Sequence, residues 1–188
     1  SKLYSYYSLL GDSHPQARPQ TISSISDITR DHLIKWHKVF YQPRYAKLYI
    51  ISNRNPDYVF GVVSSALSKW TNNDHKKPEL SQPVFNHNQH LFVQKPEMTQ
   101  GFISFVSPAI KRNSKDYVAF LIFNDIFGSG RFSSRLMHAV RVKGGKSYGA
   151  ASVLEPRSDY GVFRIATFTR IEEISKTITI IDKTMEDK

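Results

Sequence analysis

The segment from Gly128 to Tyr148, GSGRFSSRLMHAVRVKGGKSY, carries the strongest local signals in the chain. Its apolar side chains recur at helical spacing, at Phe132, Leu136 and Val140. This spacing predicts a helix over Ser133–Val142 with one buried face. The pair Gly144-Gly145 follows, and glycine readily takes the left-handed conformation that ends a helix. A helix, a glycine turn and then a new element are therefore predicted here.

Two side chains flank this glycine turn. Arg141 lies in the last helical turn, where a cation suits the helix dipole, and Tyr148 lies at the start of a predicted strand. One interpretation is structural: Arg141 is a solvated charge at a helix end, and Tyr148 is a half-buried strand residue. The other is functional, because a glycine turn can aim both side chains at one spot.

The same residues resemble a known family. SSRLMHAVRVKGGKSY is similar to the segment of pitrilysin/insulinase zinc metallopeptidases that reads roughly S-R-L-(x)4-R-E-K-R-G-L-A-Y. In that family an arginine and a tyrosine seven residues later form the substrate-binding pair, and the matching positions are Arg141 and Tyr148. Gly145 matches the family glycine. Departures from the pattern occur at Val142, Gly144 and Lys146.

The resemblance implies a division of chemistry between this chain and a partner. The family binds zinc through H-x-x-E-H, whereas none of the seven histidines here directly follows a glutamate. We expect a C-terminal inactive domain, similar to that of mitochondrial-processing-type peptidases, without metal ligands and without activity in isolation. Zinc would belong to a partner domain or subunit. Arg141 and Tyr148 would act in trans on a peptide substrate, by binding its carbonyl and stabilising the oxyanion.

The first 72 residues contain helix and strand signals in alternation. Thr29 is predicted to cap a helix that Pro43 ends, and Asn55-Pro56 is predicted to start another. Between them, residues 46–52 (AKLYIIS) have strand composition. This run resembles the helix–strand–helix ending of the family's first domain.

The remainder alternates strands and amphipathic helices. Strands are predicted at 90–95, 102–107, 147–154 and 162–170, the first two as a hairpin. A helix over 116–127 is so apolar that we expect it to pack on more than one side. A last helix, with Thr169 and Glu172 as a capping box, has an apolar stripe at Ile171, Ile174, Ile178, Ile181 and Met185.

These patterns predict an α+β fold. The resemblance implies metallopeptidase-like repeats of antiparallel sheet packed with helices, comprising the end of one repeat and most of a second. We predict a first unit over 1–72, a polar linker over 73–88 and a truncated second repeat over 89–188. We expect the sequence to be a piece of a longer protein.

Composition limits the other classes of function. The chain has 188 residues, no cysteine and a formal net charge of +10, and no apolar run is long enough to span a membrane. Its cations are scattered, so we expect no nucleic-acid partner, and a basic nucleic-acid-binding module is the remotest alternative. A non-catalytic scaffold subunit of the same fold is a second alternative. No signal peptide is predicted, and the compartment stays undetermined, with the bacterial periplasm or cell envelope as a guess.

Overall fold

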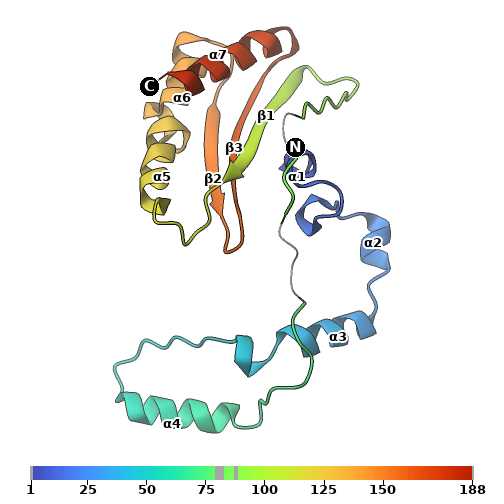
Figure 1. The fold of residues 1–188 in the computed structure, drawn as a ribbon, viewed down its shortest axis with the longest axis vertical. Coiled ribbons are helices and arrows are strands. Elements are labelled where there is room, and N and C mark those ends of the chain that lie inside the picture. The colour runs from blue at the N-terminus through green and yellow to red at the C-terminus, as the bar shows by residue number, and fades with distance from the viewer. Residues whose placement is uncertain (1, 79–82, 87–88, 188) are drawn as a thin grey trace. The chain divides into compact units, whose positions relative to one another are not determined.

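The computed structural model describes residues 2–78, 83–86 and 89–187, which form two compact units. Residues 1–19 group with 82–188, and residues 20–81 form the other unit (Figure 1). The sequence-based division at a linker over 73–88 stays a prediction. Residues 79–82 and 87–88 of that linker lie outside the described residues.

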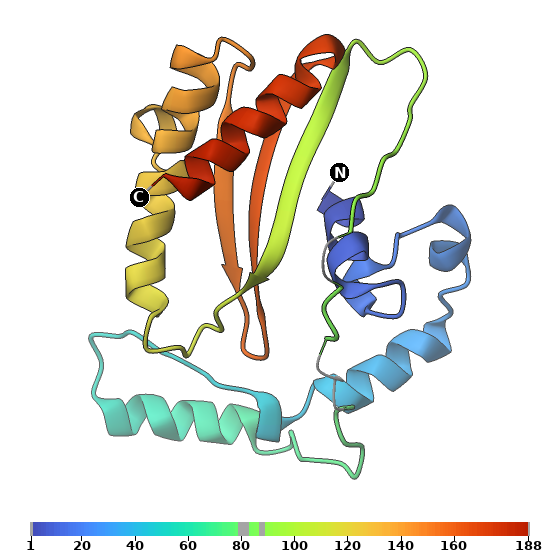
Figure 2. The same ribbon diagram turned by 45° about the horizontal axis from the view of Figure 1, so that its top comes forward.

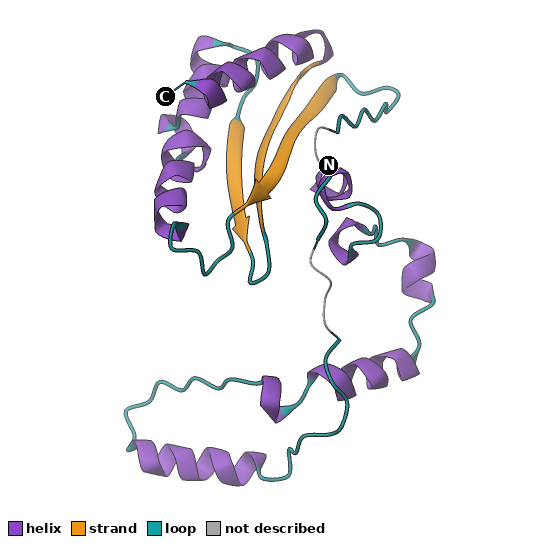
Figure 3. Ribbon diagram, viewed as in Figure 1, coloured by secondary structure: helices purple, strands orange, loops and turns teal. Residues whose placement is uncertain are grey.

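The larger unit is built on a three-stranded antiparallel sheet in the order β1-β3-β2 (Figure 3). The strands are β1 (Gln100–Ala109), β2 (Ala150–Pro156) and β3 (Gly161–Arg170). Both outer strands pair with β3, with Phe105 and Ser152 opposite Ile165. The predicted strands at 102–107 and 162–170 are confirmed, and so is the α+β class.

Helices cover one face of this sheet (Figure 2). They are α5 (Tyr117–Asn124), α6 (Arg135–Met137) and α7 (Ile174–Glu186), joined by the π-helical turns η3 (Asp125–Ser129) and η5 (His138–Lys143) and the 3-10 turns η4 (Arg131–Ser133) and η6 (Ile171–Glu173). The buried core consists of Phe127, Leu136, Val140, Ala150, Ile165 and Ile181. Because Ala150 and Ile165 belong to the sheet and the others to helices, this core joins the two layers.

The N-terminal residues pack on the opposite face. The helix α1 (Lys2–Leu10), followed by the 3-10 turn η1 (Pro15–Ala17), contributes Tyr6, Leu9 and Leu10 to a second apolar cluster with Tyr160 and Val162. The Tyr6 hydroxyl donates to Glu155 Oε2 at 2.5 Å. Helix α1 is thus tied to the β2–β3 hairpin.

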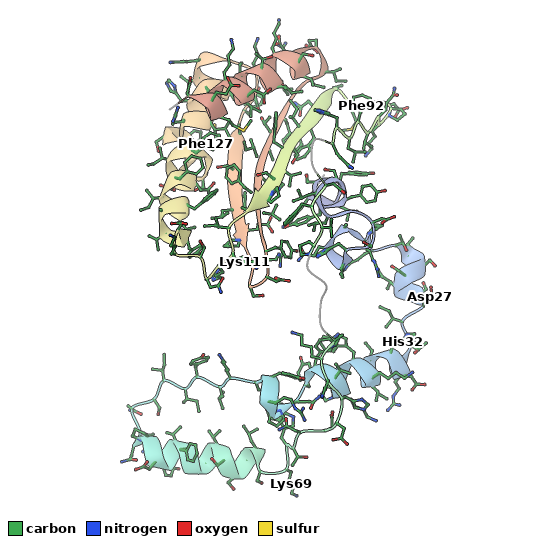
Figure 4. The ribbon with its side chains drawn as sticks, viewed as in Figure 1. Asp27, His32, Lys69, Phe92, Lys111 and Phe127 are labelled. Carbon is green, nitrogen blue, oxygen red and sulfur yellow. The ribbon has the colours of Figure 1, made fainter. Side chains whose placement is uncertain are left out.

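Three expectations outside the glycine turn are wrong in this unit. Residues 90–95 form no strand, and Phe92 projects as an exposed side chain (Figure 4). The helix over 116–127 is not buried on several sides, since Val118, Ile122 and Ile126 are exposed. Thr169 does not cap α7, because it lies in β3 and its hydroxyl donates to the Lys146 carbonyl oxygen.

The smaller unit contains α2 (Ile22–Ser26), α3 (Arg30–Phe40), the 3-10 turn η2 (Pro43–Tyr45) and α4 (Pro56–Leu67). The Thr29 cap is confirmed, because its hydroxyl accepts from the His32 amide and the His32 side chain accepts from the Thr29 amide, each at 3.3 Å. The Asn55 cap is also confirmed, since its side chain accepts from the Asp57 amide at 2.8 Å. Local sequence therefore sets these helix starts.

The predicted strand at 46–52 is wrong. The structure has no strand there, and Leu48, Tyr49, Ile50 and Ile51 are exposed. A strand needs a hydrogen-bonded neighbour, and the described part of residues 20–81 supplies none. Gln42 is the one buried residue among residues 20–78. This unit therefore consists of helices and turns, and its described residues leave most of its large apolar side chains exposed.

Candidate functional site

The glycine turn after η5 has the geometry that its sequence predicts. Gly145 has φ +58°, in the left-handed region, and the Gly144 amide donates to the Ala139 carbonyl oxygen at 2.9 Å. A side chain at Gly144 would come within 2.8 Å of that same carbonyl oxygen. The predicted helix end is confirmed. The helix begins at Arg135, two residues later than expected, because the Ser134 hydroxyl is the cap, accepting from the Met137 amide at 3.3 Å.

The backbone after this turn is held by β3. The Thr169 hydroxyl donates to the Lys146 carbonyl oxygen at 2.6 Å, and the Thr167 hydroxyl lies 2.8 Å from the Gly149 carbonyl oxygen. The Ser147 hydroxyl accepts from the Gly149 amide at 3.1 Å. Residues 146–149 are therefore fixed from both ends, which leaves little freedom for the backbone of Tyr148.

An ion pair adds to this attachment. Lys146 Nζ lies 3.0 Å from Oε2 of Glu173, a buried carboxylate at the start of α7. Arg170 and Lys176 lie at the longer distance of 3.8 Å from the same carboxylate. The hydrogen bond from Lys146 holds the pKa of the Glu173 carboxyl below its ordinary value, and the surrounding charges act in the same direction.

Arg141 is exposed and rests on an aromatic ring. Its guanidinium carbon lies 4.7 Å from the ring centroid of Phe132. The sequence predicted Phe132 for the buried face of the helix, but this side chain is 69% exposed. Within the described chain the Arg141 side chain makes no hydrogen bond or ion pair, so its N–H donors are free.

Tyr148 is 90% exposed and lies two residues before β2. The half-buried strand position, which was the structural interpretation, is therefore wrong. Its hydroxyl has no hydrogen-bond partner among the described residues. Arg141 and Tyr148 do not pair with each other either; the structure connects them through the glycine turn. Their role in substrate binding stays a prediction.

No group of three or more His, Asp or Glu side chains that could hold a metal occurs in residues 2–78, 83–86 and 89–187. Over these same ranges, no helix has the length and apolar character needed to cross a membrane.

Sequence analysis missed three contributors to the site. They are Phe132 beneath Arg141, Thr169 on the Lys146 carbonyl and Glu173 beside the Lys146 ammonium. Thr169 and Glu173 lie more than twenty residues along the chain from Lys146, and no spacing rule predicts such contacts. The exposure of Phe132 could have been suspected only because Phe132 precedes the Ser134 cap and so lies outside the helix.

The helix-covered antiparallel sheet is the architecture of a metallopeptidase-like domain, and the described residues contain no group that could hold a metal. The chain belongs to the family described as the peptidase M16 inactive domain, whose model matches residues 27–188. The resemblance to pitrilysin/insulinase peptidases is thereby confirmed. Comparison with curated proteins gave no match.

Solved structures share this fold. The chain is similar to the crystal structure of a peptidase M16 inactive domain from Pseudomonas fluorescens, with a TM-score of 0.86 and 25% identity over 98% of this chain and 44% of that one. A protease from Helicobacter pylori gives 0.76 and 18%, over 95% and 45% of the two chains. A conserved protein from Enterococcus faecalis gives 0.70 and 15%, over 98% and 43%. The chain spans less than half the length of each of these proteins.

Proposed function

We propose that this non-catalytic M16 domain binds peptide substrate for a zinc-bearing partner of the same family. Tyr148 would donate a hydrogen bond to the oxyanion that develops on the substrate, and Arg141 would donate to a substrate carbonyl. The described residues do not supply a zinc site, so the partner would provide the metal and its bound water. This chain would contribute two hydrogen-bond donors, the Tyr148 hydroxyl and the Arg141 guanidinium.

The observation that carries the proposal is the exposure of the Tyr148 side chain between residues that are held by hydrogen bonds. Its hydroxyl has no hydrogen-bond partner among the described residues, and its side chain is 90% exposed. The neighbouring residues 146, 147 and 149 are held by hydrogen bonds. A donor contributes most to an oxyanion when its position is fixed before reaction. The hydrogen bonds of residues 146, 147 and 149 would fix the backbone of Tyr148, and contact with substrate would fix its exposed side chain.

Arg141 is suited to the ground-state contact. A guanidinium has five N–H donors in a rigid plane, and the described chain occupies none of those on Arg141. Peptides that bind as an added strand present main-chain carbonyls in a regular row. One such carbonyl would be the acceptor for Arg141, in a contact that exists before the transition state.

The surface of residues 20–81 supports the need for a partner. This unit exposes many large apolar side chains, including Trp36, Leu48, Ile51, Phe60 and Trp70. Where such side chains form a continuous patch, the patch usually marks an interface. We infer that a catalytic M16 domain covers it, because the related structures contain more than twice the length of this chain.

The test is kinetic and uses this chain assembled with a zinc-bearing M16 partner. Tyr148→Phe removes one donor and keeps the ring, so turnover should fall by about 10² to 10³. Arg141→Ala should raise KM by roughly tenfold and change kcat less, because its contact is already made in the bound substrate. Tyr4→Phe, at an exposed tyrosine of α1, and Lys143→Ala, at an exposed cation near Arg141, are the matched controls.

Unchanged turnover in Tyr148→Phe would refute this role and favour a purely structural one. The scaffold alternative predicts that the assembly has no activity to lose. A large fall in melting temperature would also refute it, since the loss would then come from stability. We expect the melting temperature to stay constant, because substitutions at exposed positions seldom change stability by more than about 0.5 kcal/mol.

A further inference from the structure

Phe132 is an aromatic side chain that the fold leaves on the surface. It lies in η4, before the Ser134 cap, and is 69% exposed even though Arg141 rests on it. No other aromatic ring or cation of the described chain stacks on it. The two neighbouring apolar positions of the predicted stripe, Leu136 and Val140, are fully buried. Phe132 therefore does not belong to the core.

The contact with Arg141 limits the freedom of the guanidinium. A cation within about 6 Å of a ring centroid is attracted to the ring face, and here the distance is 4.7 Å. An arginine side chain has several rotatable bonds, and ordering it on binding costs entropy. A guanidinium that already rests on a ring has lost part of that freedom. Its N–H donors lie in the guanidinium plane and stay available.

We propose that Phe132 is a positioning and specificity residue for the peptide site. It holds Arg141 ready for a substrate carbonyl, and its exposed ring surface contacts a large apolar or aromatic substrate side chain next to that carbonyl. This inference rests on the proposed role of Arg141. It adds a substrate class, since the site then selects peptides with an apolar side chain at this position over peptides with a small polar one.

The ring has the properties that such a contact needs. Much of its surface remains open to solvent after Arg141 is in place, so apolar area is available for burial against a ligand. Phenylalanine has two side-chain torsions and loses little entropy when it is covered. A neighbouring cation with free donors adds a polar contact at the same place, and binding sites typically combine apolar walls with a few such groups.

The test uses the whole chain and two blocked peptides that differ at one residue, Ac-Gly-Gly-Phe-Gly-Gly-NH2 and Ac-Gly-Gly-Ser-Gly-Gly-NH2. Binding is followed by NMR of the ¹⁵N-labelled protein, which measures weak affinities. The variants are Phe132→Leu, Phe132→Tyr, Phe132→Ala and Arg141→Ala. Phe92→Leu is the control, because Phe92 is also exposed and contacts no cation of the described chain.

We expect the Arg141 Nε–H resonance to be shifted upfield by the ring in the wild type and in Phe132→Tyr, and to lose this shift in Phe132→Leu. Phe132→Leu should weaken binding of the phenylalanine peptide about 2- to 5-fold, which corresponds to about 0.5 to 1 kcal/mol. Phe132→Ala should abolish the preference for that peptide over the serine peptide. Melting temperatures of all variants should match the wild type, because a role limited to packing would change them.

The outcomes separate the two claims. If Arg141→Ala binds as the wild type does, or if the wild type binds neither peptide, the proposed function fails. If Arg141→Ala loses binding but Phe132→Leu binds the phenylalanine peptide as tightly as the wild type does, the positioning role of Phe132 fails alone. Equal affinity of the wild type for the two peptides would overturn the specificity, and would point to Phe132 as part of a contact with the partner domain.

Discussion

Lys146 Nζ lies 3.0 Å from Oε2 of Glu173, so the first residue after the glycine pair is tied to the start of α7. The related family pattern has a leucine at the position of Lys146. Lys146 is partly buried here, and a partly buried ammonium needs a counter-charge. Glu173 supplies it, and the same carboxylate lies near Arg170 and Lys176. The exchange of leucine for lysine is therefore accompanied by an electrostatic attachment of the turn that carries Tyr148.

Glu173→Gln should destabilise the chain at neutral pH, because it removes the negative charge shared by three cations. The wild-type pKa of this carboxyl is lowered by folding. Its contribution is therefore present above the ordinary carboxyl range and is lost as pH falls through the folded-state pKa. Chemical denaturation at a series of pH values should show the wild type and Glu173→Gln converging in acid. Glu172→Gln, at an exposed carboxylate, should change stability less, and an equal effect of the two substitutions would contradict this account.

Gly145→Ala should cost about 1 kcal/mol of unfolding free energy, because residues other than glycine pay to adopt the left-handed conformation. A Cβ at Gly145 would meet no atom within 4 Å, so the cost is conformational and not steric. The matched control is Gly149→Ala, where the φ angle is not positive and the added Cβ would contact only the Met137 methyl group at 3.6 Å. Urea unfolding of the two variants measures the difference. Equal stability of the two variants would mean that the backbone at residue 145 can leave the left-handed conformation at no cost.

Stability in alkali should depend on Tyr6. Burial, together with the hydrogen bond to Glu155, raises the pKa of Tyr6 from 10.0 to about 12. A raised pKa means that the folded chain holds this proton more tightly, so stability falls as pH rises from about 10 to about 12. Tyr6→Phe should be less stable at pH 8 and should show a flatter decline over that interval. Tyr4→Phe should leave this fall in stability unchanged. If Tyr6→Phe loses as much stability as the wild type does over this pH interval, groups other than Tyr6 cause the loss.

The isolated chain should not retain zinc. Its sequence lacks the H-x-x-E-H pattern, and zinc sites in proteins need three or four correctly placed nitrogen, sulfur or oxygen ligands. After treatment with a chelator and dialysis against zinc, elemental analysis should find well under one zinc per chain. One tightly held zinc per chain would overturn the assignment of the metal to a partner.

Sequence was sufficient where a structure depends on neighbours in the chain. The caps at Thr29 and Asn55 and the turn at Gly145 are such cases, because each depends on side chains or torsions within a few residues. The α+β class also followed from periodicity. These are local properties of the polypeptide, and local rules describe them well.

Sequence was insufficient where the outcome depends on a distant neighbour. Residues 46–52 and 90–95 have strand composition but no pairing partner among the described residues. In α7 the buried side chains include Thr177 and Thr184, while Ile171 before it and Met185 near its end are exposed. The Thr177 hydroxyl donates within the helix to the Glu173 carbonyl oxygen, which makes its burial acceptable. A hydrophobic pattern alone does not predict that a threonine is buried with its hydroxyl hydrogen-bonded.

The exposed apolar side chains of residues 20–78 affect the heat capacity of unfolding. The heat-capacity change on unfolding grows with the apolar area that unfolding exposes, at about 12 to 15 cal/mol/K per residue for an ordinary globular domain. A segment whose apolar side chains already face water has little of that area left to expose. A scan of the free chain should therefore give a heat-capacity increment roughly a third below the value for its length, and the missing part should return when a partner covers the segment.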